Sequence, residues 1–120
     1  MSIQDAERFA REWAQAWNSR DLEAVLSHFH DDVVFTSPVA AQVVPASGGV
    51  IRGKEALRAY WTAALKRVPD LHFVVQGVYA GVNALVIHYK NQKGALVNEV
   101  LIFQGDRVKE GHATYSVAVP

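Results

Sequence analysis

A glutamate stands in the middle of an apolar strand pattern near the end of the chain. Val97, Glu99, Leu101 and Phe103 alternate with the residues between them, so their side chains share one face of a predicted strand. Three of these four residues are hydrophobic and belong in a core, which places Glu99 inside with them. A fully buried carboxyl group keeps its proton to higher pH, its pKa rising by up to ~3–5 units. Glu99 is then a proton donor, half of an ion pair, or a structural acid bonded by a tryptophan N–H.

Two residues of the next predicted strand could assist Glu99 in acid–base chemistry. If the Gly-Asp pair between the strands forms a two-residue turn, strict pairing places His112 opposite Glu99, and a Glu–His pair suits general acid–base catalysis. The apolar alternation of residues 113–119 has the opposite parity, which would turn His112 outward. A bulge at Gly111 would reconcile the two patterns. The pattern favours Tyr115 inside, and the placement of His112 stays open.

The N-terminal half of the chain predicts three helices and one strand. Ser2 and the acid three residues later resemble a capping box, which starts an amphipathic helix that ends near residues 18–20. Asp21 can cap a short second helix whose buried stripe extends to Phe29. The remaining segments are a strand over residues 31–38, a loop with extended pieces at the pocket mouth over residues 39–52, and a third helix over residues 54–68.

The C-terminal half predicts one strand after another. Alternating apolar and polar residues occupy four segments separated by turn signals: residues 71–79, 84–91, 95–104 and 107–118. Helices segregated from an antiparallel sheet make an α+β fold, and 120 residues suffice for one domain over residues 1–120. A curved sheet covered by three helices would enclose a cone-shaped cavity.

The composition excludes several classes of function. Twelve basic and twelve acidic residues balance, so no basic surface indicates a nucleic-acid partner. The absence of cysteine excludes a disulfide framework, a thiol nucleophile and a cysteine–zinc site, and the five histidines have no metal-ligand spacing. No segment is apolar enough to span a membrane and no leader pattern begins the chain, so we expect a cytoplasmic protein without a metal.

Three segments of the chain carry a family likeness: AWNSRDLEAVLSHFHDDVVFTSP, RGKEALRAYW and EVLIFQGDRV. Together they resemble the nuclear-transport-factor-2-like superfamily, which includes SnoaL-type polyketide cyclases and ketosteroid isomerases, and the likeness covers nearly the whole chain. It implies a cone-shaped α+β barrel with three N-terminal helices packed on a curved antiparallel or mixed sheet. The superfamily contains enzymes, binders and assembly modules, so the fold alone does not determine the chemistry.

The ketosteroid isomerase pattern transfers only in part. That family has a catalytic aspartate just before the proline of the first strand, where this chain has Ser37. The tyrosine and the protonated aspartate of its oxyanion hole correspond to Trp13 and Glu99, and a supporting tyrosine corresponds to Trp61. A serine hydroxyl without an activating partner does not take a proton from carbon near pH 7, so we do not expect steroid isomerisation of that kind.

Aromatic residues are expected to form the walls of the pocket. Three tryptophans in a chain of this length favour a cavity for a flat apolar ligand, although helical spacing of aromatic residues also fits a plain core. Besides the catalytic candidates Glu99, Tyr115 and His112, the predicted pocket residues are Trp13, Trp17, Phe29, Phe35, Ser37, Trp61, Tyr89 and Leu101.

Three functions are compatible with such a pocket. The first is a cofactor-free isomerase, cyclase or dehydratase with Glu99 as the acid, the second a module that binds a small apolar molecule, and the third an assembly domain. The second face of the sheet is also apolar, whereas an antiparallel sheet with one wet face shows polar residues there. We therefore expect a homodimer through this outer face, formed by Val74, Val78, Val86, Val100 and Ile102.

Overall fold

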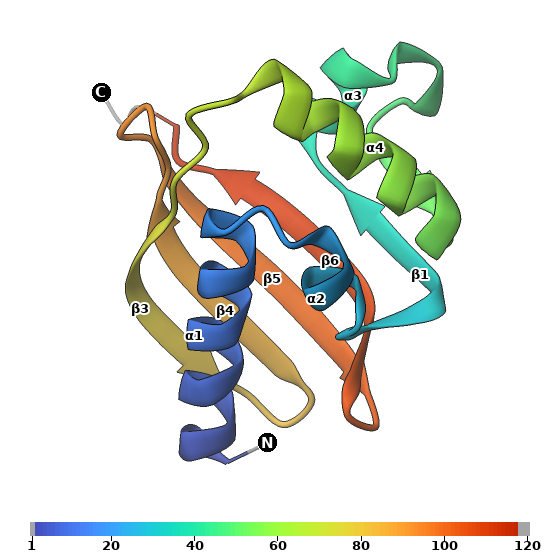
Figure 1. Cartoon of the computed structure of the whole chain (residues 1–120). Helices are drawn as coiled ribbons and strands as arrows, with labels where there is room; N and C mark the ends of the chain where they lie inside the picture. The colour runs from blue at the N-terminus through green and yellow to red at the C-terminus, as the bar shows by residue number, and fades with distance from the viewer. Residues whose placement is uncertain (1, 118–120) are drawn as a thin grey trace.

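A six-stranded sheet with helices packed on one face forms the framework of the protein (Figure 1). A computed structural model describes residues 2–117. The end of the last predicted strand and Val119 lie outside the described residues. Within residues 2–117, no helix is both long enough and apolar enough to cross a membrane.

The first two helices begin where the sequence places their caps. In α1 (Ile3–Asn18), the Ser2 hydroxyl oxygen accepts a hydrogen bond from the Asp5 backbone N–H at 3.0 Å. In α2 (Leu22–Leu26), the Asp21 carboxylate accepts one from a backbone N–H of the first turn at 3.1 Å. Each bond satisfies an N–H group for which the helix has no partner of its own, so these local signals fix both helix starts.

The segment after α2 differs most from the prediction. The strand β1 (Phe29–Thr36) already includes Phe29, which the sequence pattern had assigned to the helix. The predicted loop contains three short elements: α3 (Pro38–Val43), the 3₁₀ turn η1 (Pro45–Ser47) and β2 (Val50–Arg52). Ser37 caps α3 and a proline occupies its first turn, a combination that starts helices and that had been interpreted only as a strand end.

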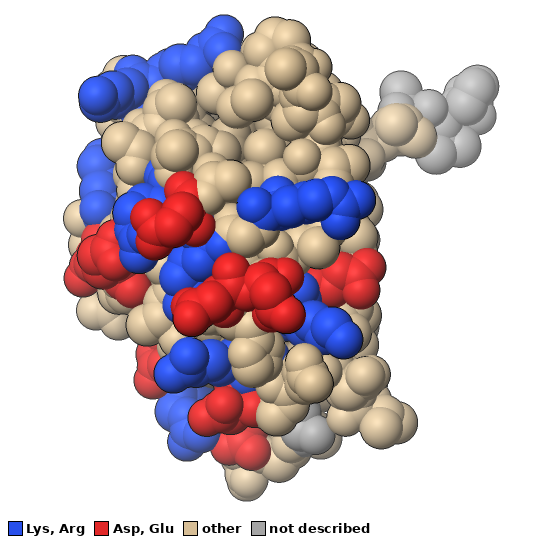
Figure 2. Space-filling model, turned by 90° about the vertical axis from the view of Figure 1, so that its right-hand side faces the viewer, with Lys and Arg blue, Asp and Glu red and all other residues tan. Residues whose placement is uncertain are grey.

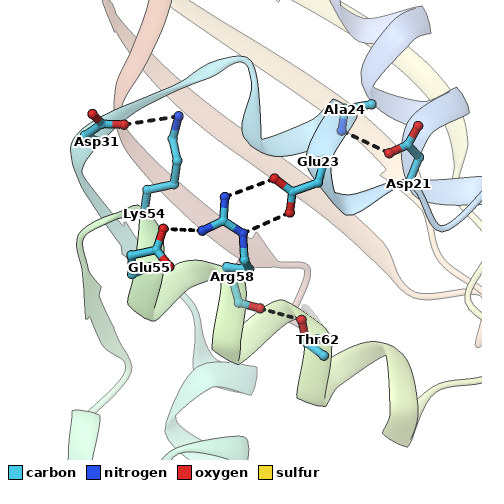
Figure 3. A network of polar contacts seen from close by, with 8 residues as sticks. All are labelled: Asp21, Glu23, Ala24, Asp31, Lys54, Glu55, Arg58 and Thr62. Carbon is cyan, nitrogen blue, oxygen red and sulfur yellow. Dashed lines mark hydrogen bonds and ion pairs between the residues drawn. The ribbon is translucent and has the colours of Figure 1, made fainter.

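The helix α4 (Lys54–Arg67) is tied to α2 by a charged network on the surface (Figure 3). The Arg58 guanidinium donates to both carboxylate oxygens of Glu23, at 2.9 and 3.0 Å, and also contacts Glu55. Space-filling atoms show acidic and basic side chains interleaved over the middle of this side of the molecule (Figure 2). Exposed pairs of this kind contribute roughly 0–1 kcal/mol each, so the network orients α4 more than it stabilises the fold.

The sheet has the strand order β2-β1-β6-β5-β4-β3. Strands β1 and β6 are parallel, and all other neighbours are antiparallel. This arrangement confirms the predicted α+β class and mixed curved sheet, but β2 and β3 form two edges, so the sheet is not closed into a barrel. The later strands are β3 (Val74–Ala80), β4 (Ala84–Lys90), β5 (Leu96–Gln104) and β6 (Arg107–Tyr115).

A bulge near the start of β6 decides which of its side chains face the interior. Phe103 pairs with Val108, but Ile102 pairs with Glu110, so Lys109 is an extra residue without a partner in β5. The extra residue reverses the parity of the rest of the strand. The sequence had predicted such a bulge, but two residues later in the strand.

The bulge turns the two candidate assistants of Glu99 to opposite faces of the sheet. Glu99 lies opposite Ala113, and His112 lies opposite Val100. Since neighbouring side chains alternate, Tyr115 shares the inner face with Ala113, and His112 points to the outer face. The strict pairing of Glu99 with His112 is therefore wrong.

A second bulge, in β3, corrects the predicted outer face. Gln76 has no partner in β4 between the paired residues Val75 and Gly77. Val78 consequently faces inward and packs against the core instead of lying on the outer face. The other predicted outer-face residues keep their outward parity: Val74, Val86, Val100 and Ile102.

Gly111 gives the buried rings room to approach β6. A Cβ atom on Gly111 would lie 3.0 Å from Cδ1 of Phe35 and 3.3 Å from Cδ2 of Leu101. We expect Gly111→Ala to lower the free energy of unfolding by about 1–3 kcal/mol, measured by urea denaturation, because both neighbours are buried. Gly77→Ala is the matched strand control, since its Cβ would meet the Tyr79 ring at an ordinary 3.6 Å. Equal losses in the two variants would contradict this explanation.

Candidate functional site

Glu99 projects from the centre of β5 into the interior, where only 5% of the residue is exposed. The Tyr89 hydroxyl donates a hydrogen bond to its Oε1 atom at 3.2 Å. Within residues 2–117, no other hydrogen bond and no ion pair reaches this carboxyl group. The sequence left three roles open for Glu99: a proton donor, half of an ion pair, or an acid bonded by a tryptophan N–H. In the structure Glu99 has no ion-pair partner among residues 2–117 and its hydrogen-bond donor is a tyrosine, so only the proton donor remains.

Burial raises the pKa of Glu99 to about 7, and the hydrogen bond from Tyr89 offsets part of that rise. A carboxylate at this position would lose its water without gaining a cation, so the protonated form is favoured. Near neutral pH both forms of Glu99 are populated, which is the condition under which one group serves well as acid or base.

Three tyrosine hydroxyl groups surround this acid. Burial raises the pKa of Tyr60 to about 12 and also raises the pKa values of Tyr89 and Tyr115, and the negative charge of Glu99 adds to each rise. Hydrogen bonding to the Ser37 side chain offsets part of the effect for Tyr60 and Tyr115. All three phenols keep their protons at neutral pH and can donate hydrogen bonds.

A cavity of about 620 Å³ extends from Glu99 toward the surface between α3, α4 and the β4–β5 turn. Its volume falls in the range of about 300–1,000 Å³ that is typical of small-molecule sites. Eight of the predicted site residues line it: Trp13, Trp17, Phe35, Ser37, Trp61, Tyr89, Glu99 and Tyr115.

The aromatic walls pack against one another. Trp17 and Trp61 meet edge to face with ring centroids 5.0 Å apart, which joins α1 to α4. Trp13 meets Tyr89 in the same manner at 5.1 Å, so the residue that bonds Glu99 is itself held by a ring from α1. The three tryptophan rings are buried in the core and also line the cavity, so the structure combines the two interpretations of the aromatic pattern.

Three predicted residues do not reach the cavity. Phe29 and Leu101 are completely buried in the core and do not line it. His112 lies on the outer face, where its Nδ1 atom is 2.6 Å from Oγ1 of Thr36 and its Nε2 atom is 2.9 Å from Oε1 of Glu110. The contact with Thr36 joins β6 to β1, the contact with Glu110 lies within β6, and His112 is not positioned to assist Glu99.

Sequence reasoning missed Tyr60 and the polar end of the cavity. Tyr60 precedes Trp61 on the apolar face of α4, and this adjacency was the available signal. Gln92 in the β4–β5 turn has a buried Oε1 atom without a hydrogen-bond partner in the described part of the chain. A turn residue belongs to no periodic pattern, so nothing in the sequence marked Gln92.

The arrangement is suited to moving protons. Protonated Glu99 can donate to a carbonyl oxygen or to a leaving hydroxyl, and ionised Glu99 can take a proton from a carbon next to a carbonyl. The Tyr60 and Tyr115 hydroxyls can bond an oxygen on which negative charge develops. No group of three or more His, Cys, Asp or Glu side chains within residues 2–117 could hold a metal ion.

The raised pKa of Glu99 predicts a pH-dependent stability. The carboxyl has a pKa of 4.5 in the unfolded chain and about 7 in the folded protein, so the folded state binds an additional proton between these values. The free energy of unfolding should fall by roughly 3 kcal/mol as the pH rises through this window, and Glu99→Gln should remove that fall. Urea denaturation of both proteins at about pH 5 and pH 8 measures it. Identical pH dependence in the two proteins would refute the assignment.

Known structures share this fold over nearly their whole length. A SnoaL-like protein of unknown function from Burkholderia thailandensis is 43% identical, with 97% of this chain and 98% of that chain covered and a TM-score of 0.90. A putative polyketide cyclase from Sinorhizobium meliloti is 13% identical, with 95% and 100% covered and a TM-score of 0.76. TerC, co-crystallised with polyporic acid, is 11% identical, with 93% and 92% covered and a TM-score of 0.76.

Comparison with curated proteins gave no match. The model of the SnoaL-like domain family, in contrast, matches residues 10–113, from the middle of α1 to near the end of β6. This agrees with the resemblance that the sequence segments carried. The chain therefore belongs to the SnoaL-like domain family.

Proposed function

We propose that this protein binds a small, flat, largely apolar molecule and transfers a proton on it without a cofactor, as an isomerase, cyclase or dehydratase does. The observation that carries the proposal is the buried Glu99 carboxyl group, which titrates near neutral pH and lines a cavity of about 620 Å³. Desolvated acids in clefts are enriched at functional sites. Rings from both α1 and α4 offer flat apolar contact to the ligand body.

In the proposed reaction Glu99 carries the proton. Tyr89 holds Oε1, and no described residue bonds Oε2, which is thus available to a substrate. Ionised Glu99 removes a proton from a carbon next to a carbonyl, and the electron pair of the broken bond moves onto the carbonyl oxygen. The Tyr115 hydroxyl bonds that oxygen, and protonated Glu99 then returns its proton to another carbon or to a leaving oxygen.

The comparisons suggest which compounds to test first. At 11% and 13% identity, TerC and the putative polyketide cyclase share only a fold with this chain. A cavity with aromatic walls and phenol donors nevertheless suits oxygen-bearing ring systems. Polyporic acid and polyketides are therefore the first ligands to offer.

Glu99→Gln keeps the size of the side chain and removes its ionisable proton. We expect turnover of any compound that the wild-type protein converts to fall by roughly 10²–10⁴-fold, with a much smaller change in affinity. Product formation followed by mass spectrometry and affinity measured by calorimetry separate the two effects. Glu110→Gln on the outer face is the matched control and should leave turnover unchanged.

Three results would decide against this mechanism. Unchanged turnover in Glu99→Gln would exclude Glu99 as the proton carrier. The wild-type protein could instead bind a compound tightly without converting it, and Glu99→Gln could lose that affinity. This result would indicate the alternative function, a non-catalytic binding module. A variant that changes in stability alone would indicate an assembly domain.

We also propose that two copies associate through the outer face of the sheet. Val86, Val100 and Ile102 lie side by side on β4 and β5 and are only half-buried by their neighbours. Val74 and Tyr79 extend this apolar surface on β3, with 47% and 62% of each residue exposed. A face of this kind is self-complementary under twofold symmetry, so a second copy is the occupant that we propose.

Val100→Glu places a charge in the middle of this surface. We expect it to shift the protein from dimer to monomer in size-exclusion chromatography with light scattering, since a like charge would meet it across a twofold axis. Gln15→Glu, exposed on α1 on the helical side, adds the same charge away from the interface and should leave the dimer intact. A wild-type protein that is monomeric at every concentration would exclude the interface.

A further inference from the structure

The mouth of the cavity contains two cations that no acidic side chain among residues 2–117 neutralises. Arg67 in the last turn of α4 and Lys93 in the β4–β5 turn both line the cavity and are exposed. Neither forms an ion pair within the described part of the chain. The acid that lines the same cavity, Glu99, is buried at its other end. The cavity therefore has an ionisable carboxyl group, Glu99, at its buried end and two basic side chains at its mouth.

These two cations come from segments far apart in the sequence that meet at one end of the molecule. The end of α4 and the β4–β5 turn both lie at the top of Figure 1. Figure 2 shows basic side chains at the top of the adjoining side, whereas the acidic ones gather lower down. Anions entering the cavity from this end would meet positive charge first.

A structural role accounts for one of these cations only in part. Basic residues in the last turn of a helix interact favourably with its macrodipole, and α4 has two of them, Lys66 and Arg67. Lys66 does not line the cavity, so the dipole alone does not explain why a cation is directed at the mouth. Lys93 is on a turn and has no helix to stabilise. Lys66 and Lys90, both exposed and outside the cavity lining, are thus natural controls.

We infer that the ligand is an organic anion, whose flat apolar body lies between the cavity rings and whose acidic group is bound at the mouth by Arg67 and Lys93. The guanidinium fork of Arg67 matches a carboxylate or sulfonate group. This arrangement also sets the direction of the ligand, because the acidic group is attracted to the mouth while the uncharged end reaches Glu99. The inference deepens the proposed function and rests on it.

Two fluorescent probes with the same ring skeleton test the inference. 8-Anilinonaphthalene-1-sulfonate carries an anionic group, and N-phenyl-1-naphthylamine lacks it. Both are titrated by calorimetry and by the rise in their own fluorescence on entering an apolar site, and the charge variants below show whether that site is the cavity. We expect the wild-type protein to bind the sulfonate more tightly than the neutral amine, with a preference that weakens as salt is added.

The double variant Arg67→Gln/Lys93→Gln should lose about 3- to 20-fold in affinity for the sulfonate and less than about twofold for the amine. The control Lys66→Gln/Lys90→Gln removes the same total charge outside the cavity and should leave both affinities unchanged. Equal losses for both probes in the first variant, or equal effects of the two variants on the sulfonate, would overturn the inference.

The binding of the two probes to the wild-type protein distinguishes failure of this inference from failure of the proposed function. Binding of the amine without any preference for the sulfonate would reject the anionic ligand and keep a cavity for flat apolar molecules. Failure of both probes to bind the wild-type protein would reject the proposed function, and the anionic ligand with it.

Discussion

The burial of one carboxyl group without a charged partner constrains the rest of this structure. A carboxylate loses its hydration in such an interior, and Glu99 receives only the Tyr89 hydroxyl in return. Burial therefore raises the pKa of this carboxyl group to about 7, which shifts it toward the protonated form relative to the unfolded chain. An aliphatic side chain between Val97 and Leu101 would fill this place without that cost. The ionised acid therefore works against stability, and this cost supports the functional role that we propose for Glu99.

The rings that desolvate Glu99 also build the site around it. Trp13 packs on Tyr89, and Trp17 packs on Trp61, so the helices and the sheet are joined through the walls of the cavity. Rings fixed on several sides have few alternative rotamers, and a site made of them changes little when a ligand enters. The same aromatic side chains form part of the core and the wall of the cavity. This double use explains how a chain of 120 residues holds a cavity of this size.

Membership of the SnoaL-like domain family defines the scaffold and leaves the chemistry to individual positions. By the resemblance to ketosteroid isomerases, Ser37 stands at the position of that family's catalytic base, and in this protein its side chain caps α3. Hydrogen bonding to Ser37 also offsets part of the rise in the pKa values of Tyr60 and Tyr115. In the function that we propose, Glu99 carries the proton, and the two cations at the mouth provide a second recognition element.

Local patterns were sufficient to predict most of the fold and the central acid. The caps at Ser2 and Asp21 act on N–H groups a few residues away, and the alternation around Glu99 needs only its own strand, so short windows of sequence contain these signals. The helix α3 was missed although Ser37 and its proline signalled it, because so short a helix has almost no periodicity to support the cap.

The sequence by itself determined the α+β scaffold, the inward direction of Glu99 and most of the aromatic wall. Only the tertiary structure decided what accompanies the acid. The extra residue Lys109 in the pairing of β6 with β5 turned His112 outward, which the sequence had left open, and the docking of α4 placed Arg67 in the lining of the same cavity as Glu99. The physical reason is that strand register and helix docking depend on partners far away in the chain, which no local periodicity encodes.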